Sequence, residues 1–338
     1  MDLSKFDFDL PTHLISQKPY KNRTDCKLLF YDKVNVSDLN FKDILSILDE
    51  SYVLVFNETK VVNARYLFNY KETPSEIFFL EHLDENQYKV FLKKPSIYKS
   101  EDWIATPDFK FRIVSSQGKY FIIDLKSELD LNIILESKGQ IPLPPYIKTD
   151  TPEVYAKDYQ TVYAQSGNSV AAPTAGLHFD KALLTALEAK GLALEYLNLD
   201  VGLGTFGALT EEQLSTGKLH SESFELTKDL ADRLNKYKRQ SKKIIAVGTT
   251  TLRTLQSCFD FESGKFIASK SETDIFIQPP FKDFVVDGLL TNFHLPKSSL
   301  FMLISAFVGT KQALEIYEHA ILEQYLFYSF GDACLFLR

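Results

Sequence analysis

The chain has 338 residues, of which 45% are hydrophobic and 25% are charged, and its net charge is −7. These proportions are those of a folded globular protein and exclude a disordered or low-complexity chain. The length predicts two domains, or one large barrel with an insertion. The negative net charge argues against nucleic-acid binding through charge alone, although a local basic face remains compatible with it.

The first nine residues, Met1–Asp9, carry acids where a secretory signal would need a basic start and an apolar core. The longest apolar run, Leu300–Val308, is about half as long as a bilayer requires. We therefore expect a cytoplasmic, monomeric protein without a membrane partner.

The cysteines are widely separated in the sequence, at Cys26, Cys258 and Cys334. Such spacing provides neither a paired zinc site nor the thiolates of an iron–sulfur cluster. We expect no bound metal.

The first sixty residues alternate between short helical and strand patterns. Helices are predicted over Leu10–Gln17 and Phe41–Leu48, and strands over Lys27–Asp32 and Tyr52–Asn57. From Tyr66 to Leu125 the pattern changes to β-rich runs with closely spaced turn residues. These runs are Glu76–Leu83, Gln87–Lys93, Trp103–Thr106, Phe109–Ser115 and Tyr120–Leu125. We interpret the block as a small antiparallel barrel inserted in a larger domain, followed by a helix at Ser127–Lys138.

Helices and strands alternate again from Thr151 onward. The predicted helices are Pro152–Val162, Asp180–Lys190, Thr210–Leu214, Thr227–Tyr237, Thr250–Cys258, Ser298–Phe307 and Lys311–Tyr325. The predicted strands are Ala193–Leu199, Ser223–Leu226, Lys243–Val247, Asp274–Ile277 and Gly288–Asn292. This alternation predicts parallel strands wrapped by helices, with ligands at the carboxyl ends of the strands.

A binding loop is predicted at Ser169–Phe179. Pro173 and Gly176 interrupt any regular element there, and the small side chains allow another molecule to approach the main chain. His178, near its end, could supply acid, base or orienting chemistry, or simply a capping hydrogen bond.

Two loops at predicted strand ends suit polar ligands. Asp200–Gly207 contains the pattern G-x-G-x-x-G, which fits a dinucleotide site, a glycine loop for another ligand or a plain tight turn. Gly248–Arg253 combines hydroxyls and free amides at a helix N-terminus with an arginine. It suits a carboxylate or phosphate, unless the threonines only cap the helix and Arg253 forms a salt bridge.

Other polar stretches could also bind polar ligands. Thr291–Lys297 is a loop stiffened by Pro296, and His220 and Glu222 combine a histidine with a carboxylate. A basic cluster could be a local basic face or a solvated helix end whose cations suit the helix dipole. Its members are Arg233, Lys236, Lys238, Arg239, Lys242 and Lys243.

Together these stretches form one set of motifs that runs nearly end to end. The set comprises Asn57–Val61 with Ala64 and Arg65, Ile141–Tyr146, Tyr159–Tyr163, Val170–Phe179, Val201–Phe206, His220–Glu222, Ala246–Thr250 with Arg253, Thr273–Ile277 and Thr291–Lys297. With this set the sequence resembles the S-adenosylmethionine:tRNA ribosyltransferase-isomerase family of queuosine biosynthesis.

The resemblance implies an α/β fold, in which a large α/β-barrel-like catalytic domain (residues 1–62 and 150–338) carries an inserted small antiparallel β-barrel domain (residues 63–149). It also implies the reaction. The ribosyl part of S-adenosylmethionine, a substrate and not a cofactor, is transferred to a 7-aminomethyl-7-deazaguanine at the wobble position of a tRNA. Epoxyqueuosine forms, and adenine and methionine leave.

The site residues are hypotheses within that resemblance. The acid/base candidates are His178, His220 and Glu222. The residues expected to bind S-adenosylmethionine are Thr174, Gly176, Gly202, Gly204, Thr205, Thr249, Thr250 and Arg253. Those expected to bind the deazaguanine or its phosphate are Arg65, Asn292, His294 and Lys297.

The sequence departs from the family pattern around the glycine loop. Asp200 stands where a histidine is usual, and Gly207 and Ala208 replace a longer polar residue and a proline. An acid in that place changes the charge at the predicted site. The departures motivate one alternative, a catalytically altered relative that binds tRNA or a nucleoside without this turnover. The G-x-G-x-x-G pattern motivates another, a Rossmann-type enzyme.

Overall fold

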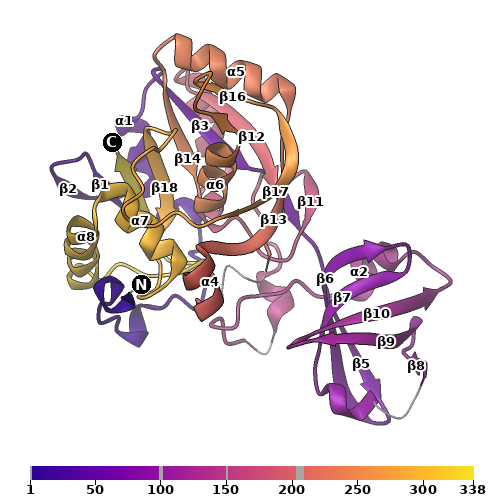
Figure 1. Cartoon of the computed structure of the whole chain (residues 1–338). Helices are drawn as coiled ribbons and strands as arrows, with labels where there is room; N and C mark the ends of the chain where they lie inside the picture. The colour runs from indigo at the N-terminus through magenta and orange to yellow at the C-terminus, as the bar shows by residue number, and fades with distance from the viewer. Residues whose placement is uncertain (1, 99–101, 150, 203–208) are drawn as a thin grey trace. The chain divides into compact units, whose positions relative to one another are not determined.

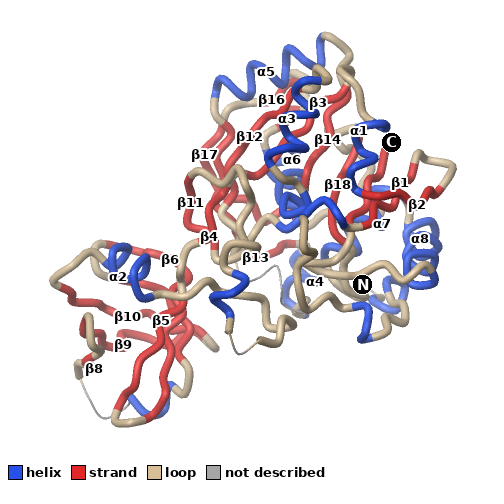
Figure 2. Tube along the Cα trace, turned by 180° about the vertical axis from the view of Figure 1, so that it is seen from behind, coloured by secondary structure: helices blue, strands red, loops and turns tan. Residues whose placement is uncertain are grey.

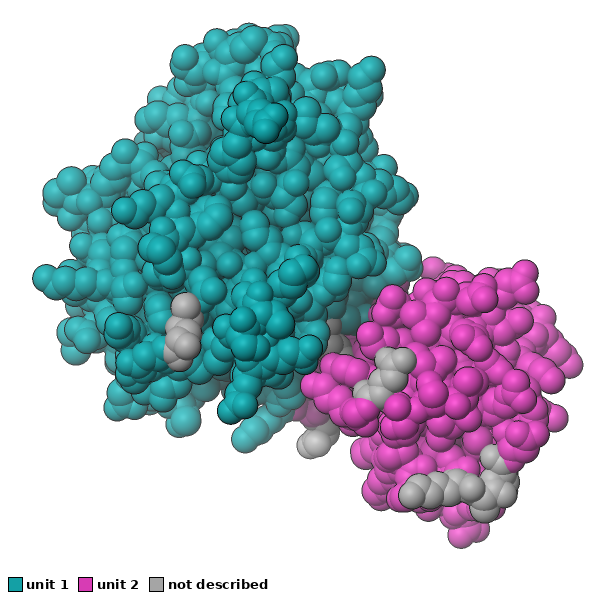
Figure 3. Space-filling view, in the orientation of Figure 1, with its two compact units in different colours: residues 1–60, 145–148, 158–338 teal, residues 61–144, 149–157 magenta. Residues whose placement is uncertain are grey.

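Figure 1 shows a computed structural model of the chain, which describes residues 2–98, 102–149, 151–202 and 209–338. The chain divides into two compact units, coloured teal and magenta in Figure 3. Unit 1 comprises residues 1–60, 145–148 and 158–338, and unit 2 comprises residues 61–144 and 149–157. The chain therefore leaves and re-enters unit 1 twice.

In the described part of the chain, unit 1 is built on a nine-stranded mixed sheet. Its strands, in spatial order, are β17 (Ser269–Ile275), β13 (Lys218–Leu226), β12 (Ala193–Leu199), β3 (Tyr52–Asn57), β14 (Lys243–Val247), β18 (Gly288–Asn292), β19 (Ala333–Leu337), β1 (Lys27–Tyr31) and β2 (Val36–Asn40). The central strands β12, β3, β14 and β18 are parallel, as are β19 and β1. The remaining pairs are antiparallel, so the predicted parallel arrangement holds only for the centre and for β19 with β1.

Both faces of the sheet are buried, which explains the unbroken apolar runs of its central strands. In β3, Val53 and Val55 face one core, and Leu54 and Phe56 face the other. The helices of unit 1 are α1 (Ile44–Ile47), α3 (Lys181–Ala189), α4 (Glu211–Thr216), α5 (Lys228–Arg239), α6 (Thr249–Ser257), α7 (Ser299–Val308) and α8 (Thr310–Leu322). The first core includes residues of α5 to α8, and the second includes residues of α1 and α3, the helices that lie nearer the viewer in Figure 2.

Local sequence signals account for most helix ends. Thr210 and Thr227, the first residues of two predicted helices, accept hydrogen bonds from the third helical residues of α4 and α5. Asp180 caps α3 in the same way. Gly191, directly after the predicted helix Asp180–Lys190, has φ = 90°, a left-handed conformation that favours glycine.

Unit 2 contains a six-stranded antiparallel sheet within the described residues. Its elements are β5 (Arg65–Tyr70), β6 (Thr73–Asp84), β7 (Gln87–Leu92), β8 (Ile104–Ala105), β9 (Phe109–Gln117), β10 (Tyr120–Ser127) and α2 (Leu131–Lys138). Alternate residues of β5, Tyr66 and Phe68, enter its core together with Ile134 of α2. The predicted fold class, α/β with an inserted antiparallel barrel-like sheet, is confirmed.

Two predicted helices are wrong, and several strands were not predicted. Leu10–Gln17 contains only a short 3-10 helix, Thr12–Leu14. The helix expected at Pro152–Val162 is limited to the 3-10 turn Pro152–Tyr155, because Tyr159 is fully buried in unit 1 and tertiary packing outweighs weak helical propensity. The missed strands are β2, β5, β19, β4 (Thr59–Val61), β11 (Ser166–Ser169), β15 (Phe259–Asp260) and β16 (Lys265–Phe266).

In the described residues, no single helix is long and apolar enough to cross a membrane. The consecutive helices α7 and α8 pass that test only as a pair, and they are bent by 113° relative to each other.

Candidate active site

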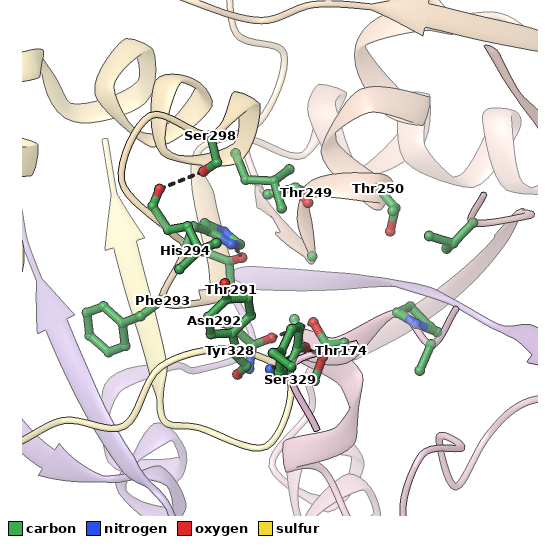
Figure 4. A pocket seen from close by; sticks show the side chains of 18 residues that line it. Thr174, Thr249, Thr250, Thr291, Asn292, Phe293, His294, Ser298, Tyr328 and Ser329 are labelled. Atoms are coloured by element: carbon green, nitrogen blue, oxygen red, sulfur yellow. Dashed lines mark hydrogen bonds between the residues drawn. The ribbon is translucent and has the colours of Figure 1, made fainter. Parts of the chain in front are cut away.

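A cavity of about 90 Å³ lies in unit 1, where β14 and β18 end and α6 begins. Figure 4 shows side chains from the end of β18 and the start of α6 around it, together with the 3-10 helix Thr174–His178 and the loop before α7. The lining residues are Tyr146, Ala172, Pro173, Thr174, Ala175, Val201, Gly248, Thr249, Thr250, Thr291, Asn292, Phe293, His294, Leu295, Ser298, Leu300, Tyr328 and Ser329. The cavity therefore sits at the carboxyl ends of parallel strands, as the sequence predicted.

The cavity wall has no Asp, Glu, Lys or Arg among the described residues. Its polar groups are hydroxyls, one amide and one imidazole. The volume gives room for roughly six water molecules, which suits one ring system, such as a nucleobase or a ribose. No group of three or more His, Cys, Asp or Glu side chains in the described ranges could hold a metal ion.

Asn292, the last residue of β18, connects the walls of the cavity. Its Oδ1 accepts a hydrogen bond from Thr174 Oγ1 at 2.8 Å, and its Nδ2 donates to the Tyr328 carbonyl at 3.0 Å. The same Nδ2 lies 2.9 Å from His178 Nε2. Asn292 is only 2% exposed, so each of these bonds replaces one that water would otherwise make.

His178 lies behind Asn292 and outside the cavity lining. Because an amide nitrogen can only donate, His178 Nε2 must accept, and the ring proton is on Nδ1, 3.3 Å from Cys26 Sγ. Burial, and then the positive charge of Arg23, lower the pKa of His178 to about 3. The imidazole is therefore neutral at pH 7, and its position is that of a support for Asn292.

His294 is in the cavity wall, as expected for a substrate-binding residue. Its Nε2 lies 3.0 Å from Thr291 Oγ1, and its backbone amide donates to the Tyr317 hydroxyl at 3.2 Å. Burial lowers the pKa of His294 to about 3, so this ring is also neutral at pH 7.

The N-terminus of α6 opens on the cavity. Gly248, with φ = 97°, precedes the helix, and Thr249 and Thr250 line the wall. Free amides at a helix N-terminus favour anionic groups.

Arg253, one turn further along α6, does not reach the cavity lining. It forms an ion pair with Glu222 of β13, and the two side chains are 6% and 4% exposed. Arg253 Nε has no hydrogen-bond partner among the described residues. Of the two predicted roles of Arg253, the structure therefore contains the salt bridge.

The structure separates the other two acid/base candidates. Glu222 Oε1 accepts a hydrogen bond from the Gly202 amide at 3.0 Å, next to Val201 in the cavity wall. His220 is exposed, and an irregularity between Lys218 and Glu222 interrupts the pairing of β13 with β17. The predicted residues Gly204 and Thr205, like Gly207 and Ala208, lie outside the described residues.

Three further predicted residues have structural partners away from this cavity. Arg65, in unit 2, binds both carboxylate oxygens of Glu76, at 2.8 and 2.9 Å. Lys297 Nζ forms an ion pair with Asp7 at 2.7 Å. Gly176 allows the close approach of Tyr163, whose hydroxyl would lie 1.9 Å from an added Cβ.

Asp200, the most conspicuous departure from the family pattern, does not line the cavity. Its Oδ1 accepts hydrogen bonds from Thr59 Oγ1 at 2.7 Å and from the Asn168 amide at 2.9 Å. The carboxylate thus connects the end of β12 to β4 and β11, and its negative charge is outside the cavity wall.

The dinucleotide hypothesis is wrong. The helix that follows the glycine loop, α4, has six residues and starts at Glu211 after its own capping residue, Thr210. The next strand, β13, is antiparallel to β12. A dinucleotide site needs a longer helix that starts on the glycines and a parallel strand after it.

Sequence patterns did not predict the aromatic part of the cavity. Tyr146 and Tyr328 line it with ring centroids 3.8 Å apart, and Ser329 lies within hydrogen-bonding distance of the Tyr146 hydroxyl. Burial raises the pKa of Tyr328 to about 12, so its phenol stays protonated. Tyr146 belonged to a recognised motif, whereas no local pattern marked Tyr328 or Ser329.

Replacing Arg253 by Met should lower the free energy of unfolding by about 3–5 kcal/mol, because the Glu222 carboxylate would stay buried without its partner. In the double variant E222L/R253M, most of the loss should be recovered. Urea unfolding of both variants measures this, and equal stability of R253M and the unsubstituted protein would contradict the buried ion pair.

The two neutral histidines predict a loss of stability in acid. Below pH 6.5 the unfolded chain protonates His178 and His294, whereas the folded chain keeps both neutral until about pH 3. The free energy of unfolding should therefore fall by up to about 1.4 kcal/mol per pH unit for each histidine. Urea unfolding at several pH values between 7 and 5 tests this. The slope should decrease in H294Q.

Comparisons with known proteins agree with this fold. The family model described as "Queuosine biosynthesis protein" matches residues 3–336. A relative from Vesicomyosocius okutanii is 44% identical over 335 residues, with 98% of this chain and 97% of the relative covered. A relative from Halothermothrix orenii is 40% identical over 346 residues, and both chains are covered completely. Both are named S-adenosylmethionine:tRNA ribosyltransferase-isomerase.

A solved structure also matches this chain over nearly its whole length. The crystal structure of S-adenosylmethionine tRNA ribosyltransferase from Thermotoga maritima is 29% identical, with a TM-score of 0.57, and the match covers 98% of this chain and 100% of that one. On the family match over almost its whole length and on these identities, the chain belongs to the queuosine biosynthesis protein family, whose curated members are the S-adenosylmethionine:tRNA ribosyltransferase-isomerases.

Proposed function

We propose that this enzyme transfers and isomerises the ribosyl group of S-adenosylmethionine onto a 7-aminomethyl-7-deazaguanine at the wobble position of a tRNA. The products are epoxyqueuosine, adenine and methionine. Family membership supports the enzyme class. The single observation that supports this chain's own part is the cavity without charged side chains at the strand ends, lined by hydroxyls, an amide, an imidazole and two tyrosine rings.

The chemistry makes several demands on such a site. The sulfonium acidifies the adjacent C5′ carbon of the ribose, so a base must remove a proton there. Adenine must receive a proton to leave. The methionine carboxylate needs a fixed anion site, and water must be excluded.

Uncharged polar side chains meet the demands of the nucleoside and of the leaving adenine. Asn292 presents an amide that is held by Thr174, His178 and Tyr328, so its orientation is fixed before a substrate binds. The protonated phenol of Tyr328 can donate a hydrogen bond to a leaving purine. We place a nucleoside ring in this cavity.

The carboxylate of methionine is assigned to the N-terminus of α6, with the hydroxyls of Thr249 and Thr250. Arg253 is excluded from this role by its ion pair with Glu222. Glu222 is our proposal for the base, since its carboxylate contacts the Gly202 amide beside the cavity wall and an ionised carboxylate can accept a proton. His178 is given a positioning role through Asn292.

The function is tested by incubating the purified protein with S-adenosylmethionine and a tRNA that carries 7-aminomethyl-7-deazaguanine. We expect epoxyqueuosine in the digested tRNA, detected by mass analysis, and one adenine released per nucleoside formed. Binding of the tRNA without either product would support the alternative, a catalytically altered relative, and would refute the proposed turnover.

The role of Asn292 is tested with Thr174→Val, which keeps the side-chain shape and removes the hydroxyl that donates to Asn292 Oδ1. We expect kcat/KM for S-adenosylmethionine to fall about tenfold, which corresponds to the loss of one hydrogen bond of about 1.4 kcal/mol in the transition state. Thr251→Val is the matched control, because Thr251 is buried in the same unit but bonds only to the Val247 carbonyl. Equal rates for the two variants would contradict the assignment.

A further inference from the structure

A second hollow of unit 1 lies at the other end of the strands that carry the candidate active site. It is an open groove of about 650 Å³. Lys243, the first residue of β14, and Asp287, directly before β18, line it, whereas the first cavity lies where those strands end. The five residues of β14 span about 16 Å, so the two sites are separate.

The groove is basic on a chain that is acidic overall. Five cationic side chains, Lys238, Lys242, Lys243, Lys282 and Arg338, face two carboxylates, Asp283 and Asp287, which gives a local net charge of +3. In the described ranges, none of the five cationic groups lies within ion-pair distance of a carboxylate. The groove therefore holds an excess of cations, and none of them forms an ion pair with a described carboxylate of this chain.

Aromatic rings lie beside two of these cations. Lys238 Nζ lies 4.2 Å from the ring centroid of Phe259, and Arg338 Cζ lies 4.8 Å from that of Phe284. Phe261 is 58% exposed, although it sits edge-on to Phe259 at 5.1 Å. Unpaired cations next to an accessible aromatic ring match what single-stranded nucleic acid requires: charge for its phosphates and a flat surface for a base.

The basic cluster identified in the sequence is divided by the fold. Arg233 is bound to Glu195, with Nη2 2.8 Å from Oε2, and takes no part in the groove. Lys236 and Arg239 are exposed on α5 but do not line it. Lys238, Lys242 and Lys243 do line it, so the cluster is neither one continuous basic face nor merely a solvated helix end.

We infer that this groove binds phosphates and an adjacent base of the tRNA substrate, outside the nucleotide that enters the candidate active site. The inference rests on the proposed function, which supplies the tRNA. Because the chain has a net charge of −7, long-range attraction to RNA is weak, and a separate basic groove provides the affinity that an uncharged catalytic cavity does not. The phenyl rings beside these cations favour RNA over an acidic protein surface, because a base can stack on an accessible ring.

The test compares two double variants with the same change in charge. K238E/K242E reverses two cations of the groove, and K236E/R239E reverses two cations of α5 outside it. Binding of an unmodified tRNA transcript is measured by fluorescence anisotropy between about 50 and 200 mM salt. We expect K238E/K242E to raise Kd at least about tenfold relative to the control and to reduce the slope of log Kd against log salt by about two.

Steady-state kinetics provides the second readout. In K238E/K242E, KM for tRNA should rise, whereas KM for S-adenosylmethionine at saturating tRNA should match that of the control. Phe261→Ala should weaken tRNA binding about fivefold or more, as expected for a lost stacking contact, without changing the salt slope. Ile267→Ala, at a similarly exposed apolar residue (49%), is its control.

Equal tRNA affinity and salt dependence of the two double variants would overturn the inference, and would leave the proposed function intact if the unsubstituted protein modifies tRNA. A protein that neither binds nor modifies tRNA overturns both. If K238E/K242E loses only the binding of polyglutamate, while its tRNA affinity equals that of the control, the groove is a site for acidic protein and the inference is wrong.

Discussion

The candidate site depends on one side chain, Asn292, and on the hydrogen bonds that fix it. The amide is buried at the end of a central strand, so all of its bonds must come from the protein or a ligand. Thr174, His178 and the Tyr328 carbonyl supply them from segments far apart in the sequence. The cavity is therefore shaped before a substrate arrives, and the orientation of the amide requires no further rearrangement.

A second constraint is that charge is kept out of the cavity wall. Arg253 and Glu222 neutralise each other beside it, and Asp200 is held by Thr59 and the Asn168 amide. The two buried histidines next to or within the wall are neutral because protonation would place an uncompensated charge in a buried site. Such a wall suits a substrate with a positively charged sulfonium group, because the wall has no fixed cation that would repel it.

The same logic explains why recognition of a polyanion needs another surface. Phosphates are bound by cations, and the described cavity wall has none. The groove at the opposite end of β14 and β18 combines unpaired cations with aromatic rings. On this proposal, uncharged groups near the strand ends hold the reacting nucleoside, while tRNA affinity comes from a site that does not disturb the electrostatics of the reaction.

The sequence alone determined the fold class, the exact span of β3, β12, β14 and β18, and the loops at their ends, because apolar strands and capping residues are local patterns. It also located five residues of the cavity wall, namely Thr174, Thr249, Thr250, Asn292 and His294. Only the tertiary structure decided which polar residues already have a protein partner. A local pattern cannot show that Arg253 meets Glu222, that Lys297 meets Asp7 or that Tyr328 closes the cavity, since each contact joins segments brought together only by packing.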